Sequence, residues 1–145
     1  MVVVGIQIDQ PLDVLWNFVT NPATWERWHG AGIDRVFPRW QEGAIVRWKG
    51  LGKLAGMSPE STVTSFVDHK LIGFKSTATT EVIKFEPIAD ELTRVEWRCK
   101  PEGGAYFTDG GAETRREIAS ELNNLKRLVE AIDPREVALA PEANP

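Results

Sequence analysis

The chain has 145 residues with 17 Lys or Arg and 21 Asp or Glu, so its formal net charge is −4. This acidic balance and the lack of any Lys/Arg run argue against a nucleic-acid surface or a polybasic membrane anchor, and the length fits one domain with a substantial core. A single cysteine excludes a disulfide within the chain and a four-cysteine zinc site, so no metal site is expected.

The first 28 residues predict a strand followed by two short helices. Residues 2–8 are rich in β-branched side chains, which favours a β-strand. After Asp9, a predicted N-cap, apolar residues recur at helical spacing: Leu12, Leu15, Trp16 and Val19. Asn21 and Pro22 restart the chain as N-cap and first helical residue, so 23–28 is predicted as a second helix. Neither helix is long enough to be stable alone, so both must pack on a larger element.

The middle of the chain predicts an antiparallel sheet. Apolar and polar residues alternate in a series of short segments, with connections too short for crossover helices: 46–49, 61–67, 71–78, 82–88 and 92–100, with a weaker strand at 33–37. In the last segment Val95, Trp97 and Cys99 share one side, and in its neighbour Ile83 and Phe85 point inward. The faces assigned to the interior are almost wholly apolar.

The last predicted element is a long amphipathic helix over 112–132. Its apolar residues are spaced by four and three positions: Ile118, Leu122, Leu125, Val129 and Ile132. Asp109 is the expected N-cap. Residues 1–132 are therefore expected to form one domain, and the Pro-containing tail at 133–145 is expected to be disordered.

This order of elements resembles the helix-grip fold of the SRPBCC superfamily, which includes START lipid-transfer domains, the birch-pollen-allergen group and the polyketide cyclase/dehydrase group. The likeness covers about residues 1–132 and is carried by Pro11 with Trp16, Phe18 and Trp25 through Trp28, by Glu42-Gly43, by Thr93-Arg94-Val95-Glu96-Trp97, and by the terminal helix. The resemblance implies an α+β fold in which a curved antiparallel sheet of six to seven strands wraps around the long C-terminal helix.

The resemblance also implies a cavity between sheet and helix that holds a hydrophobic small molecule, such as a lipid, a polyketide or an aromatic compound. The aromatic residues expected to line it are Trp28, Trp48, Phe66, Phe74, Phe85, Trp97, Tyr106 and Phe107. For each residue taken singly, the alternative is that it fills the core.

Polar candidates for chemistry are few. His29 could act as a general base, but an exposed position at the end of the second helix is the favoured interpretation. Tyr106 and Asp109 flank a glycine-rich loop near the expected cavity mouth, where either could gate the cavity or supply an acid. His69 is expected to face solvent in a hairpin turn, and Cys99 to be a small buried hydrophobe. None of the common nucleotide, nucleophile or metal motifs occurs, so no cofactor is expected.

Three functions remain open. The favoured one is a carrier or sensor for a hydrophobic molecule, because the inward faces are apolar. A cyclase/dehydrase-type enzyme would need a polar group in the cavity, so finding His29 or an arginine there, in contact with a water or ligand, would favour catalysis. A protein-interaction module, for example a toxin–antitoxin component, would have a packed core without a cavity. No signal peptide or membrane-spanning stretch is seen, so a cytoplasmic location is expected; a homodimer is left open.

Overall fold

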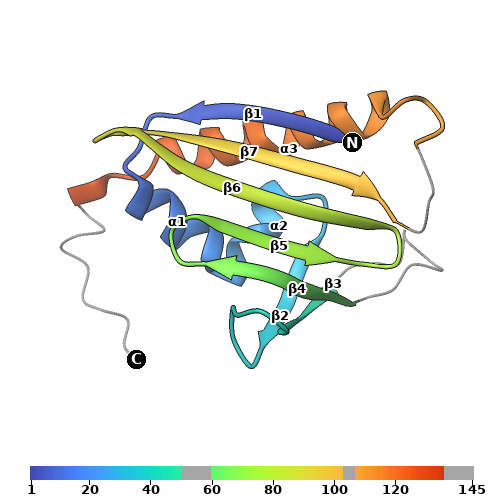
Figure 1. Cartoon of the computed structure of the whole chain (residues 1–145). Coiled ribbons are helices and arrows are strands. Elements are labelled where there is room, and N and C mark those ends of the chain that lie inside the picture. Colours follow the sequence, from blue (N-terminus) through green and yellow to red (C-terminus); the bar gives the residue numbers. More distant parts are fainter. Residues whose placement is uncertain (50–59, 103–106, 136–145) are drawn as a thin grey trace.

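Seven antiparallel strands form one curved sheet, and the helices lie on one of its faces (Figure 1). The computed structural model describes residues 1–49, 60–102 and 107–135. The strands are β1 Val2–Ile8, β2 Gly32–Phe37, β3 Ile45–Lys49, β4 Glu60–Val67, β5 Leu71–Lys75, β6 Thr79–Ala89 and β7 Leu92–Pro101. The helices are α1 Leu12–Thr20, the 3₁₀ helix η1 Pro22–Thr24, α2 Trp25–Trp28 and α3 Ala112–Glu130. The predicted α+β helix-grip fold is confirmed.

The strand order is β1-β7-β6-β5-β4-β3-β2, so the first strand lies beside the last. In that pair Val4 lies opposite Trp97 and Ile8 opposite Thr93. The remaining neighbours are sequential hairpins, as the short predicted connections required. This order places α3, which follows β7, against the β1 end of the sheet (Figure 1).

The predicted boundary between β5 and β6 is wrong by three residues. The strand predicted to run to residue 78 ends at Lys75, and β6 begins at Thr79, where a turn was expected. The side chain of Ser76 determines the turn, because its Oγ accepts hydrogen bonds from the backbone N–H groups of Ala78 (3.1 Å) and Thr79 (3.2 Å). The inward row of β6, which contains Ile83, therefore extends back to Glu81.

The helix ends differ from the predicted caps in two places. Pro11, not Asp9, is the N-cap residue of α1, and the backbone N–H of Asp9 instead donates to Glu130 Oε2 (2.7 Å). The N-cap residue of α3 is Gly111, in the left-handed region at φ 90°. Asp109 nevertheless supports this end, because its carboxylate accepts from the N–H groups of Gly111 and Glu113. The predicted Asn21 cap is confirmed, since Asn21 Oδ1 accepts from Ala23 N (3.1 Å).

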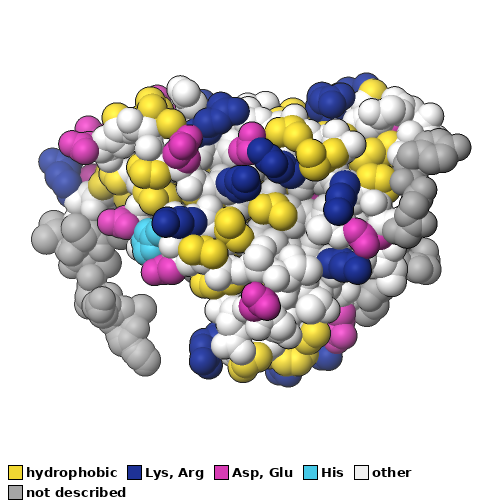
Figure 2. All heavy atoms as spheres, in the orientation of Figure 1, with side chains coloured by type: hydrophobic (Ala, Val, Ile, Leu, Met, Phe, Trp, Pro, Cys, Tyr) yellow, Lys and Arg dark blue, Asp and Glu magenta, His cyan; other side chains and the backbone are white. Residues whose placement is uncertain are grey.

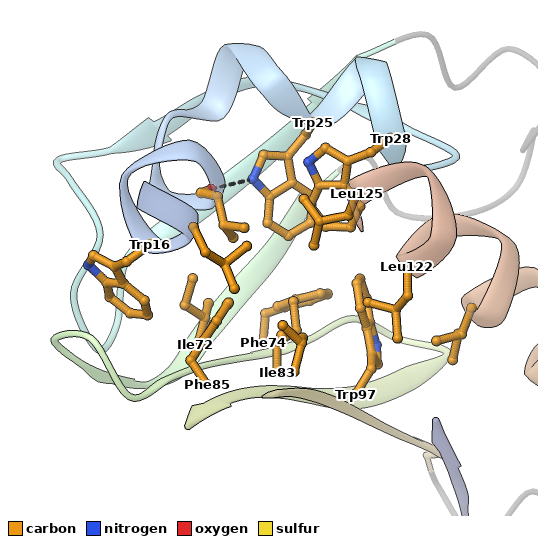
Figure 3. Packing of buried hydrophobic residues seen from close by; sticks show 14 of the residues in the cluster. Trp16, Trp25, Trp28, Ile72, Phe74, Ile83, Phe85, Trp97, Leu122 and Leu125 are labelled. Carbon is orange, nitrogen blue, oxygen red and sulfur yellow. Dashed lines mark hydrogen bonds between the residues drawn. The ribbon is translucent and has the colours of Figure 1, made fainter. Parts of the chain in front are cut away.

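A cluster of large aromatic side chains fills the space between the helices and the sheet (Figure 3). Trp25 and Trp28 point from α2 toward the sheet, while Phe74 and Trp97 point back from the strands. Leu125 joins them from α3. Trp25 is fully buried, and its indole N–H donates to the carbonyl of Val19 in α1 (2.7 Å), drawn as the dashed line in Figure 3. The two short helices are thus held by tertiary packing, as their length required.

The opposite face of the sheet meets solvent, where acidic and basic side chains are interspersed with hydrophobic ones (Figure 2). Arg98 and Glu96 of β7 pair there at 3.0 Å. Within the described residues, no helix is both long and apolar enough to cross a membrane, and no group of three metal-ligating side chains could hold a metal ion.

A buried glutamine joins the start of α1 to the end of α3. Gln10 Nε2 donates to the carbonyls of Val129 (2.9 Å) and Ile132 (2.7 Å), and Thr93 Oγ1 donates to the carbonyl of Gln10 (2.9 Å). These bonds join the segment before α1 to the end of α3, where the carbonyl of Val129 also accepts from the backbone N–H of Ile132 (3.1 Å).

Replacing Gln10 with alanine should lower the free energy of unfolding by about 1–3 kcal/mol, because Val129 and Ile132 each lose a hydrogen bond from a buried side chain. Urea denaturation would measure the change. The exposed Gln7 on β1 is the matched control, and Gln7→Ala should change stability by less than about 0.5 kcal/mol. Equal effects of the two substitutions would contradict this role for Gln10.

Candidate functional site

A cavity of about 850 Å³ opens between α3, the inner ends of β6 and β7, and the turn that joins α2 to β2. This volume lies within the usual range for small-molecule sites. Its described walls combine aromatic, apolar and ionisable side chains: Trp28, His29, Thr79, Glu81, Cys99, Phe107, Arg116, Glu117, Ile118, Glu121 and Asn124, together with the backbone of residues 30–31.

His29 lies on the cavity wall, and the favoured prediction that it would be exposed is wrong. Its side chain is only 15% exposed, and its ring stacks between Trp48 and Trp97 at centroid distances of 5.4 and 5.6 Å. Its backbone N–H donates to the carbonyl of Trp25 (2.7 Å) at the end of α2, and contacts with Trp48 and Trp97 hold the ring inside. Burial lowers the pKa of His29, opposed by the backbone contact to Ala31, which favours a neutral ring near pH 7.

The two ring nitrogens of His29 have different surroundings. Nδ1 lies 2.9 Å from the carbonyl oxygen of Ala31 and 3.1 Å from the backbone nitrogen of the same residue. When Nδ1 carries the proton, it can donate a hydrogen bond to the carbonyl of Ala31. When Nδ1 is unprotonated, it can accept one from the backbone N–H of Ala31, so both neutral tautomers have a partner. Nε2 lies 4.0 Å from Glu121 Oε1. The ring is thus held by one nitrogen while the other can exchange a proton.

Glu81 brings a carboxyl group to the inner face of β6. Its Oε1 accepts from the indole N–H of Trp97 (2.9 Å), and its Oε2 accepts from the hydroxyl of Thr79 (2.9 Å). Burial is the main cause that raises the pKa of Glu81, with these two hydrogen bonds opposing it. Electrostatic interaction with His29 also opposes the rise, whereas repulsion from Glu121 adds to it. The ionisation of Glu81 is therefore linked to the charge states of His29 and Glu121.

Glu121 brings a second carboxyl group to the cavity from α3. Its Oε2 accepts from the backbone N–H of Gly30 (2.8 Å), which ties the helix to the turn after α2. Burial raises the pKa of Glu121 to about 7, opposed by the Gly30 bond and assisted by the neighbouring charge of Glu117. A carboxyl group that titrates near neutral pH beside a neutral imidazole can both donate and accept protons.

The structure divides the eight predicted ligand-binding aromatics between this cavity and other places. Trp28 and Phe107 line the cavity, and Trp97 and Trp48 lie directly behind it against His29. Tyr106 is outside the described residues.

The other three aromatics are part of the packed interior. Phe74 is buried against Trp25 and Trp97, and Phe66 packs on Trp16. Phe85 meets Trp16 edge-on at 5.1 Å and lines a second hollow of about 650 Å³ beside α1. Phe74 thus lies behind the two rings that stack on His29, whereas Phe66 and Phe85 belong to the part of the core beside α1 (Figure 3).

Two other predicted residues also take clear places. Asp109 is exposed and supports the start of α3, and its bonds from Glu113 and Gly111 lower its pKa. His69, in the β4–β5 turn, is half-buried instead of freely solvated. Its Nε2 lies 3.0 Å from Asp13 and its Nδ1 lies 2.8 Å from Asp68, and its ring stacks on Trp16.

The cavity also contains the one cysteine of the chain. Cys99 is buried, as predicted, and burial raises the pKa of its thiol to about 12, which keeps it protonated.

Sequence reasoning missed Glu81 and Glu121. Glu81 shares its parity with Ile83 and Phe85 and would have been assigned inward had the strand been extended to Thr79. Glu121 follows Ile118 by three positions and precedes Leu125 by four, which places it beside the buried stripe of α3. Both signals were present, but each also fits a solvated surface residue.

One protein-family model matches nearly the whole chain. A model of the family "Polyketide cyclase / dehydrase and lipid transport" matches residues 2–130. No curated protein matches the chain in sequence.

Solved structures similar to this chain share its fold at low sequence identity. A conserved protein of unknown function from Enterococcus faecalis is 17% identical with a TM-score of 0.69, covering 99% of this chain and 75% of that one. The di-domain ARO/CYC protein StfQ of the steffimycin biosynthetic pathway is 12% identical with a TM-score of 0.65, covering 90% of this chain and 45% of that one. The Aha1 dimer from Colwellia psychrerythraea is 17% identical with a TM-score of 0.62, covering 90% and 98%.

The carboxyl carbon of Glu121 should titrate with a midpoint near pH 7 instead of its ordinary value of 4.5. Glu117→Gln should lower this midpoint, because it removes a neighbouring negative charge. ¹³C NMR of side-chain carboxyl groups measures both. A midpoint near 4.5 in the unmodified protein would contradict the burial of this group.

The same titration predicts a stability change. Because folding raises the pKa of Glu121, the folded state binds more protons than the unfolded state between about pH 4.5 and 7. Its stabilising contribution is present below that range and is lost as the pH rises through it, by about 1–3 kcal/mol. Denaturation at several pH values should show a smaller loss in Glu121→Gln, whereas the exposed Glu113→Gln should behave like the unmodified protein.

Proposed function

We propose that this protein binds a small, largely hydrophobic molecule in the cavity between the sheet and α3. The chain belongs to the polyketide cyclase/dehydrase and lipid transport family, which supports this proposal. It would act as a carrier or sensor of that molecule. The observation that carries the proposal is the cavity itself, of about 850 Å³, which lies at the His29 end of the inner face.

The wall has the character that such a ligand needs. Trp28, Phe107 and Ile118 offer apolar surface, while Glu81 and Glu121 offer polar groups that would fix its orientation. The indole N–H of Trp28 is buried and has no hydrogen-bond partner among the described residues. An unsatisfied buried donor is costly, so a ligand oxygen that reached it would remove that cost.

A second function, proton transfer within the same cavity, is favoured by one specific observation. His29, Glu81 and Glu121 face a common space, and burial shifts the pKa of each toward its neutral form. His29 Nε2 could take a proton from the carbon next to a carbonyl of the ligand, while protonated Glu121 gives its own proton to the carbonyl oxygen. An enzyme of the cyclase or dehydrase kind uses such steps.

The third function, a protein-interaction module, receives less support because the expected packed core without a cavity is not what surrounds His29. A homodimer stays a prediction. The similarity to a protein solved as a dimer concerns the fold.

Native mass spectrometry of the purified protein should show a co-purifying small molecule. Asn124→Trp should abolish the bound mass, because Asn124 lines the cavity and the indole would fill it. Asn123→Trp is the matched control, since the exposed neighbouring residue is not on the described cavity wall. Retention of the same ligand by both variants would place it elsewhere in the molecule.

Proton transfer can be tested with 2-tetralone as a model ketone in D₂O. The protein should accelerate exchange of its α-protons, followed by ¹H NMR, and His29→Gln should reduce the accelerated rate by about 100-fold. Glu113→Gln, outside the cavity wall, should leave the rate unchanged. Exchange at the buffer rate with the unmodified protein, or full activity of His29→Gln, would count against this second function.

A further inference from the structure

The two carboxyl groups inside the cavity pair with no permanent cation among the residues that the structure describes. Within the described part of the chain, no lysine or arginine nitrogen lies within 4.0 Å of either Glu81 or Glu121. The nearest basic group is His29, at 4.0 Å from Glu121, and its burial favours the uncharged ring.

Carboxylates elsewhere in the chain are treated differently. Glu26 is exposed, and Glu96, Glu102 and Glu130 are half-buried, yet each of the four pairs with a lysine or arginine. The need for a partner is greater where water is excluded, because an unpaired charge there is costly. In the cavity, by contrast, the described residues place no lysine or arginine within ion-pair distance of Glu81 or Glu121.

The remaining charged groups on the wall increase the negative balance. Glu117 adds a third carboxylate at the exposed edge of α3. Arg116 is the one arginine on the described wall, and it is exposed and interacts with Asp109, whose pKa it lowers. Three carboxyl groups therefore face the cavity against one guanidinium, which is engaged at the rim.

The aromatic surroundings suit a cation as well. Trp28 and Phe107 present ring surface on the wall, and Trp97, whose N–H donates to Glu81, holds that carboxylate next to an indole. Indole faces attract cations, and the attraction is stronger where water is excluded. An apolar body and a positively charged group would both find partners in this cavity.

We propose that the molecule bound in this cavity carries a basic nitrogen, as an amine or amidine on an aromatic or apolar body, and that Glu81 and Glu121 neutralise its charge. This inference rests on the proposed ligand-binding function and names the chemical class of that ligand. Hydrogen bonds between an ammonium group and a carboxylate would fix the orientation of the molecule, while its body packs on Trp28 and Phe107.

Two probes of equal shape test the proposal: 2-naphthylmethylamine, which is a cation at neutral pH, and 2-naphthylmethanol, which is neutral. Isothermal titration calorimetry at about pH 8 should give at least tenfold tighter binding of the amine. Glu81→Gln and Glu121→Gln should each bring the two affinities to within about threefold of one another. Glu113→Gln, on the same helix but off the described cavity wall, should keep the full preference.

The unmodified protein provides a second test that does not depend on any variant's folding. Amine affinity should rise about tenfold from pH 6 to pH 8, because Glu121, with its pKa of about 7, becomes ionised while the amine stays protonated. The affinity of the neutral alcohol should not rise in the same way. The cavity wall also carries other ionisable groups, namely His29, Glu81, Glu117 and Arg116. Glu121→Gln should flatten the pH dependence of amine affinity, which would assign that dependence to Glu121.

The outcomes separate this inference from the proposed function. If the alcohol binds as tightly as the amine, or if 2-naphthylacetate binds more tightly than both, the ligand class is wrong while the cavity remains a binding site. If none of the three probes binds and no molecule co-purifies, both proposals fail. Preference for the amine that survives both glutamine substitutions would also overturn the inference.

Discussion

The structure depends on how one side chain, Trp25, is buried. Its ring contacts Trp28, Trp48, Phe74 and Trp97, and its N–H satisfies the carbonyl of Val19. A buried tryptophan of this kind removes about 150–250 Å² from water, far more than helices of nine and four residues could gain by themselves. The packing of Trp25 on the sheet therefore determines how α2 is oriented relative to α1. Because His29 follows at the end of the same turn of helix, its place in the cavity is a consequence of that packing.

The core and the candidate site are parts of one continuous surface. Along the inner row of β6, Phe85 and Ile83 are apolar and buried, whereas Glu81 and Thr79 are polar and reach the cavity. The indole of Trp97 lies at the boundary, since it is fully buried and yet donates to Glu81. Packing that stabilises the fold thus also orients a carboxyl group, so substitutions of the core at this end should affect binding without touching the ligand.

The fold could be predicted from local patterns, but the site could not. Strand alternation and the spacing of Ile118, Leu122 and Leu125 each follow from neighbours in the sequence, which is why the seven strands and α3 were found. Whether His29 lies inside or outside depends on the direction in which the chain leaves α2, and that direction is determined by contacts with Trp48 and Trp97 far along the chain. From the sequence alone, Glu121 is predicted to be a solvated helix residue. Its burial becomes evident only when the distance between α3 and the sheet is known.

The ionisable groups of the cavity make the empty protein less stable than it could be. Desolvation is the main cause that raises the pKa of both Glu81 and Glu121, so their ionised forms are penalised in the folded state. Apolar side chains of similar volume at these positions would avoid the penalty and extend the packing of Ile83 and Leu122. Stability alone would favour apolar contacts at this end of the inner face, like the edge-on contact of Phe85 with Trp16. The proposed cationic ligand would compensate these buried carboxyl groups, so its binding would also raise the free energy of unfolding.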